Sequence, residues 1–529
     1  MKTSKKIGKL SLLSLLGALF ALASCGPTNA SSSSSPEEES SSASSETKSE
    51  SSSIASSSSE ESSSESSLYQ GDPKTFRFYC INDFHGSIVN RGNEVGLQKL
   101  FSFLKSEVDK DPEHTFVFSA GDMFQGSWES NSNYGKFITE AMNAVPFTAG
   151  ALGNHDFDYG LEALKDLRDL AAFPMLGSNI YYYGTETKWE EAGSSLLVEK
   201  DGVKIGIIGT IGQGQTTSIQ SNIVKDFDFI DPVPIIKEES KKLREKGAQI
   251  IVNITHNKST SLNSFTFTGG AKPYFDGCFL GHSHQAERVI RQGVPYIQGG
   301  CNGRQYSYFE LKIDELGVTY DNANYFDAPS FMEIDPVFVE LENKYLDEAF
   351  YTKANEVLAN LTGTRLDSHG VARLGVKAMY EEYKSLHPDL VCTMENSQRA
   401  TLYTGPFTYG ELYQATPFMN HFVVAKVLGG EIKRQASYNS TYTGDYETYA
   451  TLNDDTYYTC GIIDYVYYHR DTNKDFDYFP SATNPENIIH EYVDYPVDIT
   501  ARYLKNTLHG EINGLDFEQD SPGFCLYGR

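Results

Sequence analysis

Short β-prone runs that alternate with helical segments are the feature that most constrains the fold of this chain. Most of these runs are followed within a few residues by Asp, His or Asn. We expect strands at 76–81, 115–120, 147–152, 203–209, 250–254 and 277–280, and helices at 97–108 and 137–144. This alternation predicts an α/β fold in which helices cover buried β-sheets.

Polar clusters follow five of the expected strands. Ligands bind α/β sheets at the carboxyl ends of their strands, so we expect these side chains to converge. Oxygen and imidazole donors without a thiolate suit divalent Zn, Mn or Fe and not a structural zinc site. A single Asp or His near a strand end is usually an ordinary loop residue, but five clusters in order indicate a metal site. The candidate donors are Asp83, His85, Asp122, Asn154, His256, His282 and His284.

The N-terminal residues have the features of a bacterial lipoprotein signal. A lysine-rich start is followed by an apolar run at 10–22, which is too short to span a membrane permanently, and then by Ala23-Ser24-Cys25-Gly26. Small residues before a cysteine resemble a lipobox, which implies a signal peptide at 1–24 and lipidation of Cys25. We therefore expect an extracytoplasmic protein that is anchored to the bacterial cell membrane. An ordinary signal peptide before an incidental cysteine is the alternative.

Residues 25–68 are expected to form a disordered spacer after the lipid anchor. Of the 37 residues from 31 to 67, 23 are serine and 8 are glutamate. Such a segment has almost no apolar surface to bury and cannot recover the entropy lost on ordering.

The charge of the chain restricts its partners. The formal net charge is -27, which argues against binding a nucleic-acid polymer by neutralising its phosphates. An anionic substrate would need bound metal ions or a few well-placed arginines to overcome this field. The sequence does not indicate a protein partner.

Four of the polar clusters resemble the motifs of calcineurin-like metallophosphatases. They are Asn82-Asp83-Phe84-His85-Gly86, Ser119-Ala120-Gly121-Asp122-Met123-Phe124-Gln125-Gly126, Gly153-Asn154-His155-Asp156-Phe157-Asp158 and Gly281-His282-Ser283-His284. More narrowly, the chain resembles the secreted 5′-nucleotidase family. This resemblance implies a four-layer αββα metallophosphatase domain at 69–335, a linking helix at 336–362 and a smaller α+β substrate-binding domain at 363–529.

The same resemblance implies how the donors share two divalent ions, Zn, Mn or similar. One ion is held by Asp83, His85 and His284, the other by Asn154, His256 and His282, and Asp122 bridges them. His155 and Asp158 match the catalytic His–Asp dyad, whose imidazole stabilises charge on the phosphate or on the leaving oxygen. The implied reaction is hydrolysis of a nucleotide to nucleoside and phosphate by a hydroxide that bridges the two ions.

The second half of the chain resembles the substrate-binding domain of that family. Its signature is Gly405-Pro406-Phe407-Thr408-Tyr409-Gly410-Glu411-Leu412 together with Pro417-Phe418-Met419-Asn420. There the phenylalanine of the second motif stacks on the base and its asparagine contacts the base. The resemblance also implies Arg365, Arg399, Tyr465 and Asp471 as substrate-binding residues, by their positions relative to the family pattern. Tyr465 also lies in a Tyr-rich stretch, where it is alternatively a structural residue.

Two stretches depart from the family pattern. Met394-Glu395-Asn396-Ser397-Gln398 replaces an Asn-Gly-Gly-rich stretch, and His469-Arg470 replaces a Gly-Gly pair. Loss of glycine limits close backbone approach to a ligand, so the preferred substrate stays open. The alternatives are a 2′,3′-cyclic-nucleotide 2′-phosphodiesterase, a UDP-sugar hydrolase and a nucleotide-binding surface protein without turnover.

Overall fold

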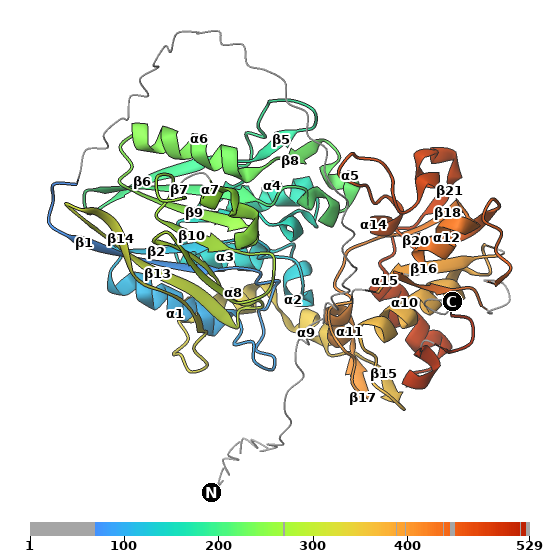
Figure 1. Ribbon diagram of the computed structural model, residues 1–529. Coiled ribbons are helices and arrows are strands. Elements are labelled where there is room, and N and C mark those ends of the chain that lie inside the picture. Colours follow the sequence, from blue (N-terminus) through green and yellow to red (C-terminus); the bar gives the residue numbers. More distant parts are fainter. Residues whose placement is uncertain are drawn as a thin grey trace, which may run out of the picture. The chain divides into compact units, whose positions relative to one another are not determined.

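The strands between residues 69 and 330 lie mainly in two six-stranded β-sheets in the computed structural model (Figure 1). The structure describes residues 69–267, 270–387, 389–396, 398–436, 438–444, 450–518 and 520–524. The first sheet has the order β14 (Gly317–Asp327), β13 (Gln305–Asp314), β1 (Lys74–Ile81), β2 (Thr115–Ser119), β3 (Ala149–Ala151) and β4 (Met175–Leu176). The second has the order β11 (Glu287–Arg291), β12 (Val294–Gln298), β10 (Gly277–Leu280), β9 (Ile250–His256), β7 (Val203–Ile211) and β6 (Ser195–Lys200).

Strand direction brings the predicted polar clusters together. In the first sheet β1, β2 and β3 are parallel, and in the second sheet β7, β9 and β10 are parallel. Parallel neighbours end at the same edge of their sheet. The backbone N–H of His282, after β10, donates to Asp83 Oδ1, after β1, at 3.0 Å. The two functional edges are therefore in direct contact.

Apolar side chains fill the space between the sheets and the space beneath the outer helices. Phe78 of β1 and Phe279 of β10 belong to one buried cluster that includes residues of both sheets. Helices α1 (Leu97–Lys110) and α3 (Lys136–Ala144) share a second core with the other face of the first sheet. Helix α6 (Pro232–Glu245) packs on the second sheet. These layers confirm the predicted αββα architecture.

Residues 357–524 form a second α/β part with two sheets. The five-stranded sheet has the order β19 (Asn439–Tyr442), β16 (Val391–Glu395), β20 (Tyr457–Ile463), β18 (Phe422–Leu428) and β21 (Ile488–Glu491). The three-stranded sheet has the order β17 (Gly405–Thr408), β15 (Val357–Thr362) and β22 (Glu511–Asn513). The main helices are α10 (Ser368–Tyr383), α11 (Tyr409–Ala415), α12 (Gly429–Gln435), α14 (Asp464–Tyr467) and α15 (Pro496–Arg502). A second α/β domain therefore follows the two large sheets.

The prediction of a single linking helix at 336–362 is wrong. The segment contains two helices, α8 (Pro336–Tyr345) and α9 (Glu348–Ala354), and then strand β15. Asp347 starts the second helix, because its side chain accepts a hydrogen bond from a backbone N–H of the first turn at 2.9 Å. β15 pairs with β17, which lies far along the chain. Helical spacing of Leu and Glu concealed both the cap and this long-range pairing.

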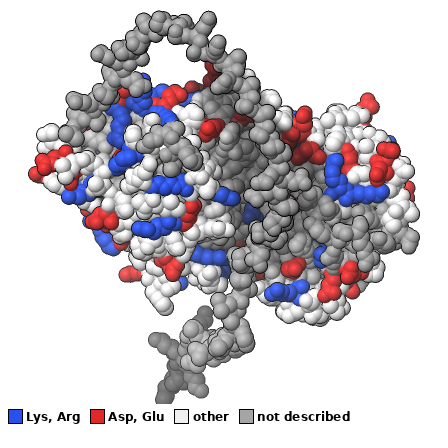
Figure 2. Space-filling model, in the orientation of Figure 1, with Lys and Arg blue, Asp and Glu red and all other residues white. Residues whose placement is uncertain are grey.

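Three observations bear on location and partners. The predicted signal peptide, Cys25 lipidation and spacer fall on residues 1–68, outside the described residues. No helix in the described part of the chain is both long enough and apolar enough to cross a membrane. Figure 2 shows Lys and Arg interspersed with Asp and Glu on the face in view.

Candidate metal centre and substrate pocket

Five of the predicted metal ligands have a backbone conformation that is unusual for residues with a side chain. The φ angles of Asp83, His85, Asp122, His282 and His284 are 48°, 48°, 55°, 74° and 57°. Such conformations cost of order 1–3 kcal/mol each and persist where the surrounding structure imposes them, commonly at functional sites. Their concentration in the loops after β1, β2 and β10 indicates a functional centre.

Glycines next to these ligands make room for the imidazole of His256. A Cβ atom built on Gly121 would lie 2.7 Å from His256 Nδ1, and one built on Gly281 would lie 2.9 Å from the same atom. Gly121 also has a φ of 87°, which side chains disfavour. The glycines of the Gly-Asp and Gly-His-x-His motifs are therefore required by packing around His256, which is fully buried.

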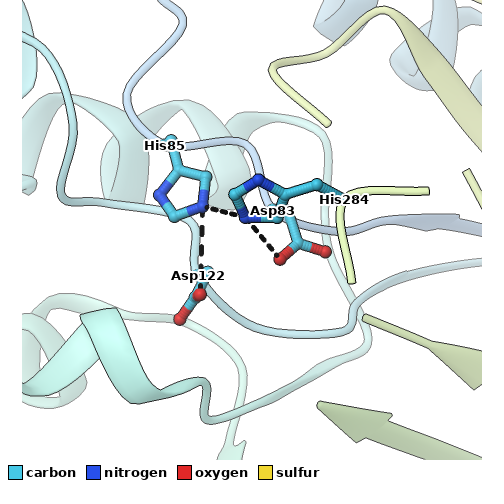
Figure 3. Close-up of side chains that lie close together, drawn as sticks. All are labelled: Asp83, His85, Asp122 and His284. Carbon is cyan, nitrogen blue, oxygen red and sulfur yellow. Dashed lines mark hydrogen bonds and ion pairs between the residues drawn. The ribbon is translucent and has the colours of Figure 1, made fainter. Parts of the chain in front are cut away.

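Asp83, His85, Asp122 and His284 form the first group of donors (Figure 3). His85 Nε2 is 2.9 Å from His284 Nε2 and 3.9 Å from Asp122 Oδ2. His284 Nε2 is 3.4 Å from Asp83 Oδ1. One ligand atom from each residue lies within 4.8 Å of the others, so a single cation fits among them.

Asp122 also belongs to a second group, with His256 and His282. Its Oδ2 is 3.1 Å from His256 Nε2. Asn154 Oδ1 lies 3.2 Å from His256 Nε2 and 3.0 Å from His282 Nδ1, which adds an amide oxygen to this group. All seven predicted donors therefore meet in one place, and Asp122 is common to both groups.

Backbone carbonyls orient two of the imidazoles. His85 Nδ1 is 3.0 Å from the Gln125 carbonyl oxygen, and His256 Nδ1 is 2.8 Å from the Ala120 carbonyl oxygen. A carbonyl only accepts, so each Nδ1 carries the proton, and Nε2 points at the shared centre. Such outer contacts fix the tautomer and the ring orientation of metal-binding histidines.

Burial keeps three imidazoles in the form that binds metal. It lowers the pKa of His282 and of His284 to about 4, and holds the pKa of His85 well below its usual value. These rings are therefore neutral at pH 7, and neutral imidazole is the ligand form. For His256, burial opposes protonation but the Asp122 charge prevails and raises the pKa to about 9, so a bound cation would replace that proton.

The carboxylates of the centre fit a cationic occupant. Burial raises the pKa of Asp83 to about 6; the His256 charge opposes this shift and the Asp122 charge adds to it. Two buried carboxylates this close repel each other unless positive charge lies between them. Together with the imidazole and amide donors they are consistent with a binuclear metal site, in which Asp122 would contribute to both donor groups.

Asp156 is a functional-site residue that the sequence analysis did not single out. Its carboxylate accepts hydrogen bonds from the backbone N–H groups of Asp122, Met123 and Gly153 at 3.0, 2.9 and 2.8 Å. Burial, together with the Asp122 charge, raises its pKa to about 7. Asp156 thus ties the Gly-Asp loop to the Gly-Asn-His loop, and its place inside the latter motif was the available signal.

The predicted dyad lies beside the metal centre. His155 Nδ1 is 2.7 Å from Asp158 Oδ2. Burial opposes protonation of His155, but the Asp158 and Asp122 charges outweigh it and raise the His155 pKa. Arg399 Nη2 lies 2.9 Å from His155 Nε2, although the two residues are 244 positions apart. The structure therefore brings a predicted substrate-binding arginine to the dyad.

A cavity of about 290 Å³ opens on this centre. Its lining includes Arg399, Phe418, Asn420 and Tyr465 from the second part of the chain, next to His155. The guanidinium carbon of Arg399 is 5.3 Å from the Phe418 ring centroid. Four residues that sequence reasoning did not assign to binding also line it: Ser218, Gln220, Glu395 and Met419. Met419 lies inside the Pro-Phe-x-Asn motif and Glu395 inside a stretch that departs from the family pattern, whereas no motif marked Ser218 or Gln220.

Two of the predicted substrate-binding residues are not brought to this cavity. Arg365 is exposed between β15 and α10. Asp471 is turned onto its own loop, where Oδ1 accepts from the backbone N–H groups of Asn473 at 2.8 Å and Asp475 at 3.1 Å. Neither residue is part of the cavity lining. Their proposed contacts with a substrate stay predictions, and the spacing that suggested Asp471 did not place it in the pocket.

Side-chain amides connect the two parts of the chain around the cavity. Gln125 Nε2 and Asn131 Nδ2 donate to the Pro417 carbonyl oxygen at 3.0 and 2.9 Å. Gln220 Nε2 donates to Asp464 Oδ2 at 2.9 Å. Pro417 precedes Phe418 and Asp464 precedes Tyr465, so these bonds set both aromatic residues relative to the metal centre.

Comparison with known proteins agrees with this geometry. Residues 76–286 match the calcineurin-like phosphoesterase family. The chain is 27% identical to an apyrase of Tabanus yao over 391 residues, which cover 64% of this chain and 69% of the apyrase. It is 29% identical to a 5′-nucleotidase of Vibrio cholerae over 194 residues, covering 35% of this chain and 34% of that enzyme.

A solved structure has the same fold over most of the chain. The 5′-nucleotidase precursor from Thermus thermophilus superposes with a TM-score of 0.67 at 18% identity, covering 83% of this chain and 97% of that one. The fold and the site define a calcineurin-like metallophosphoesterase. Within that class, the chain is similar in sequence and in fold to 5′-nucleotidases.

Proposed function

We propose that the protein hydrolyses nucleotides to nucleoside and phosphate, as a phosphoesterase of the 5′-nucleotidase type. One observation carries the proposal: Arg399 lies over the Phe418 ring and also contacts His155 Nε2 at 2.9 Å. An aromatic surface and the metal centre therefore share one pocket. This arrangement suits a substrate that joins a flat ring to a phosphate, and relatives named apyrase and 5′-nucleotidase support it.

The protein's own groups act on the phosphate around the ions. Bound divalent ions offset phosphate charge and make water a stronger nucleophile. Asp158 accepts from His155 Nδ1 and fixes the ring, so that Nε2 faces the pocket. A proton at Nε2 can then be donated to a phosphate oxygen or to the leaving ribose oxygen.

Arg399 is placed to act together with His155. Two donors that face each other at 2.9 Å are unfavourable when both carry protons. An anionic phosphate between them accepts from both, which makes the charge-assisted arrangement favourable. Arg399 thus favours protonation of His155 when the substrate is bound rather than before.

Replacing Phe418 by Ala is expected to raise KM for AMP by about 5- to 100-fold, because base stacking on an aromatic ring is worth roughly 1–3 kcal/mol. The effect on kcat is expected to be smaller. Steady-state phosphate release measures both constants. Phe331→Ala is the matched control, because Phe331 is 95% exposed. An unchanged KM in Phe418→Ala would count against the stacking role.

Chelation is expected to abolish phosphate release from AMP, and one or more divalent ions to restore it. The physical reason is that the buried carboxylates and neutral imidazoles of the centre need cations. The decisive test adds Mn, Zn, Co and Mg in turn to chelated protein and measures the products formed from 5′-nucleotides, 2′,3′-cAMP and UDP-glucose. Products are separated by chromatography, because opening the cyclic ester or splitting UDP-glucose releases no inorganic phosphate. Full activity in chelator without added metal would refute the metal role.

The same screen separates the alternatives. Faster turnover of 2′,3′-cAMP or UDP-glucose than of 5′-AMP assigns the phosphodiesterase or sugar-nucleotide activity. Binding of AMP without phosphate release assigns a nucleotide-binding surface protein.

We also propose that the enzyme acts outside the cytoplasm, anchored by lipid on Cys25. The basic start, the apolar run at 10–22 and the small residues before Cys25 support this. Cys25→Ser is expected to move the protein from the membrane fraction to the soluble fraction and to prevent incorporation of labelled palmitate. Unchanged labelling in this variant would refute the anchor.

A further inference from the structure

Glu395 lines the same cavity but has no part in the metal groups or in the His155–Asp158 pair. It is the last residue of β16. The preceding residue, Met394, packs against α10, since its Sδ lies 2.8 Å from a Cβ built on Gly375. Side chains alternate between the two faces of a strand. Glu395 therefore points away from α10, toward the cavity that it lines.

The backbone around Glu395 is held firmly. Glu395 pairs with Asn439 across the antiparallel β16–β19 ladder. Gln398 Nε2 donates to the Glu395 carbonyl oxygen at 2.9 Å, and the side chain of Asn396 donates to the Tyr438 carbonyl oxygen at 2.8 Å. Arg399 follows four residues later in the sequence, and the side chains of Glu395 and Arg399 line one cavity.

The carboxylate also lies near the aromatic part of the pocket. Burial raises the pKa of the Tyr465 phenol above its usual value, and the negative charge of Glu395 adds to that shift. A nucleoside that occupies the space lined by Phe418 and Tyr465 therefore meets Glu395 as well.

Asp471, a substrate-binding residue implied by the family resemblance, is not part of the cavity lining. Its side chain accepts hydrogen bonds from two backbone N–H groups of its own loop. Three carboxylates are among the described lining residues. Asp122 belongs to the two donor groups, Asp158 orients His155, and Glu395 is the third.

We propose that Glu395 is a specificity-determining residue that accepts hydrogen bonds from O–H or N–H donors of the nucleoside. This inference rests on the proposed function and deepens it. An ionised carboxylate is an acceptor with two oxygens, which matches the ribose hydroxyls or the amine of a base. It favours nucleotides with such donors and disfavours those that bring a second negative charge to this point.

Adenosine is the probe that tests the assignment, because it carries both kinds of donor and no phosphate. Its binding is measured by calorimetry for the full-length wild type, Glu395→Gln and Glu486→Gln. Glu486 is an exposed carboxylate in the same part of the chain, so its replacement makes the same change of charge. We expect Glu395→Gln to raise the Kd about tenfold or more, since hydrogen bonds to charged groups are among the strong ones.

The control variant is expected to bind adenosine as the wild type does. An unchanged Kd in Glu395→Gln, or an equal loss in Glu486→Gln, overturns the proposal. If Glu395→Gln does not fold, Glu395→Asp tests the same point, because it keeps the charge and withdraws the oxygens by one methylene group. That variant is expected to bind more weakly than the wild type, and unchanged binding overturns the proposal.

Two analogues identify the donor. 2′,3′-Dideoxyadenosine lacks both secondary hydroxyls of the ribose, and purine riboside lacks the amine. The difference between wild type and Glu395→Gln is expected to shrink for the analogue that lacks the donor bound by Glu395. A loss of the same size for adenosine and for both analogues indicates a general disturbance of the pocket and overturns the proposal.

These measurements are separate from the test of hydrolysis. Adenosine binding that depends on Glu395, without phosphate release from any metal-loaded nucleotide, contradicts the proposed hydrolysis and supports the assignment of Glu395. No adenosine binding by the wild type overturns the assignment, whatever the hydrolytic activity.

Discussion

Replacing Asp122 by Asn is expected to lower kcat of the metal-loaded enzyme by about 10³-fold or more, beyond the typical cost of removing a single stabilising group from an active site. Asp122 belongs to both donor groups, so its charge would compensate a cation in each of them. The amide keeps an oxygen that can accept from the His155 backbone N–H, which donates to Asp122 Oδ1 at 2.7 Å. We therefore expect the fold to be retained.

Metal content and thermal unfolding measure the two parts of this prediction. Asp122→Asn is expected to bind less metal, by elemental analysis, and to unfold in one cooperative transition. Asp321→Asn is the matched control, because Asp321 is exposed on β14, away from the donor groups. Wild-type turnover and wild-type metal content in Asp122→Asn would contradict the role of Asp122 as a shared ligand.

Replacing His155 by Ala is expected to lower kcat by about 10²- to 10⁴-fold, the usual contribution of a group that transfers a proton. Its ring contacts Asp158 and Arg399, and His155 belongs to neither group of metal ligands. Metal content should therefore stay at the wild-type level. This separates His155 from Asp122, whose replacement affects metal and turnover together.

The leaving group distinguishes the two roles open to His155. If its proton goes to the leaving oxygen, the loss in His155→Ala shrinks for p-nitrophenyl phosphate, whose leaving group needs no proton. If the ring stabilises charge on the phosphate, the loss is the same as for AMP. His369→Ala, at an exposed histidine of α10, is the control. Undiminished turnover of AMP by His155→Ala would refute both roles.

The elements that periodicity predicted well are those whose signals are local. The expected strands at 76–81, 250–254 and 277–280 lie within or coincide with β1, β9 and β10. Their apolar residues are buried on both faces, so a continuous apolar run marks them. The prediction of one helix at 336–362 was wrong because the helical spacing of Leu and Glu concealed the cap at Asp347. The pairing of β15 with β17 also depends on residues far along the chain.

For the metal centre, the sequence alone was enough to name seven side chains that the structure brings together, and the His155–Asp158 pair. Each of the seven lies at or shortly after the carboxyl end of a strand, and parallel strands deliver their ends to one edge of a sheet. The motif glycines were visible in the sequence as well. The need for glycine there appears only in the folded structure, where the His256 ring packs against both positions.

The substrate pocket depended on tertiary structure. Arg399 reaches His155, Glu395 enters the pocket lining and Asp471 does not, because loops of the second part are positioned by Gln125, Asn131 and Gln220 across the cavity. These are single hydrogen bonds between distant segments and leave no periodic mark in the sequence. The chemistry of the metal centre was therefore encoded locally, at strand ends, whereas the choice of side chains that meet the rest of the substrate was decided by how the chain folds back on itself.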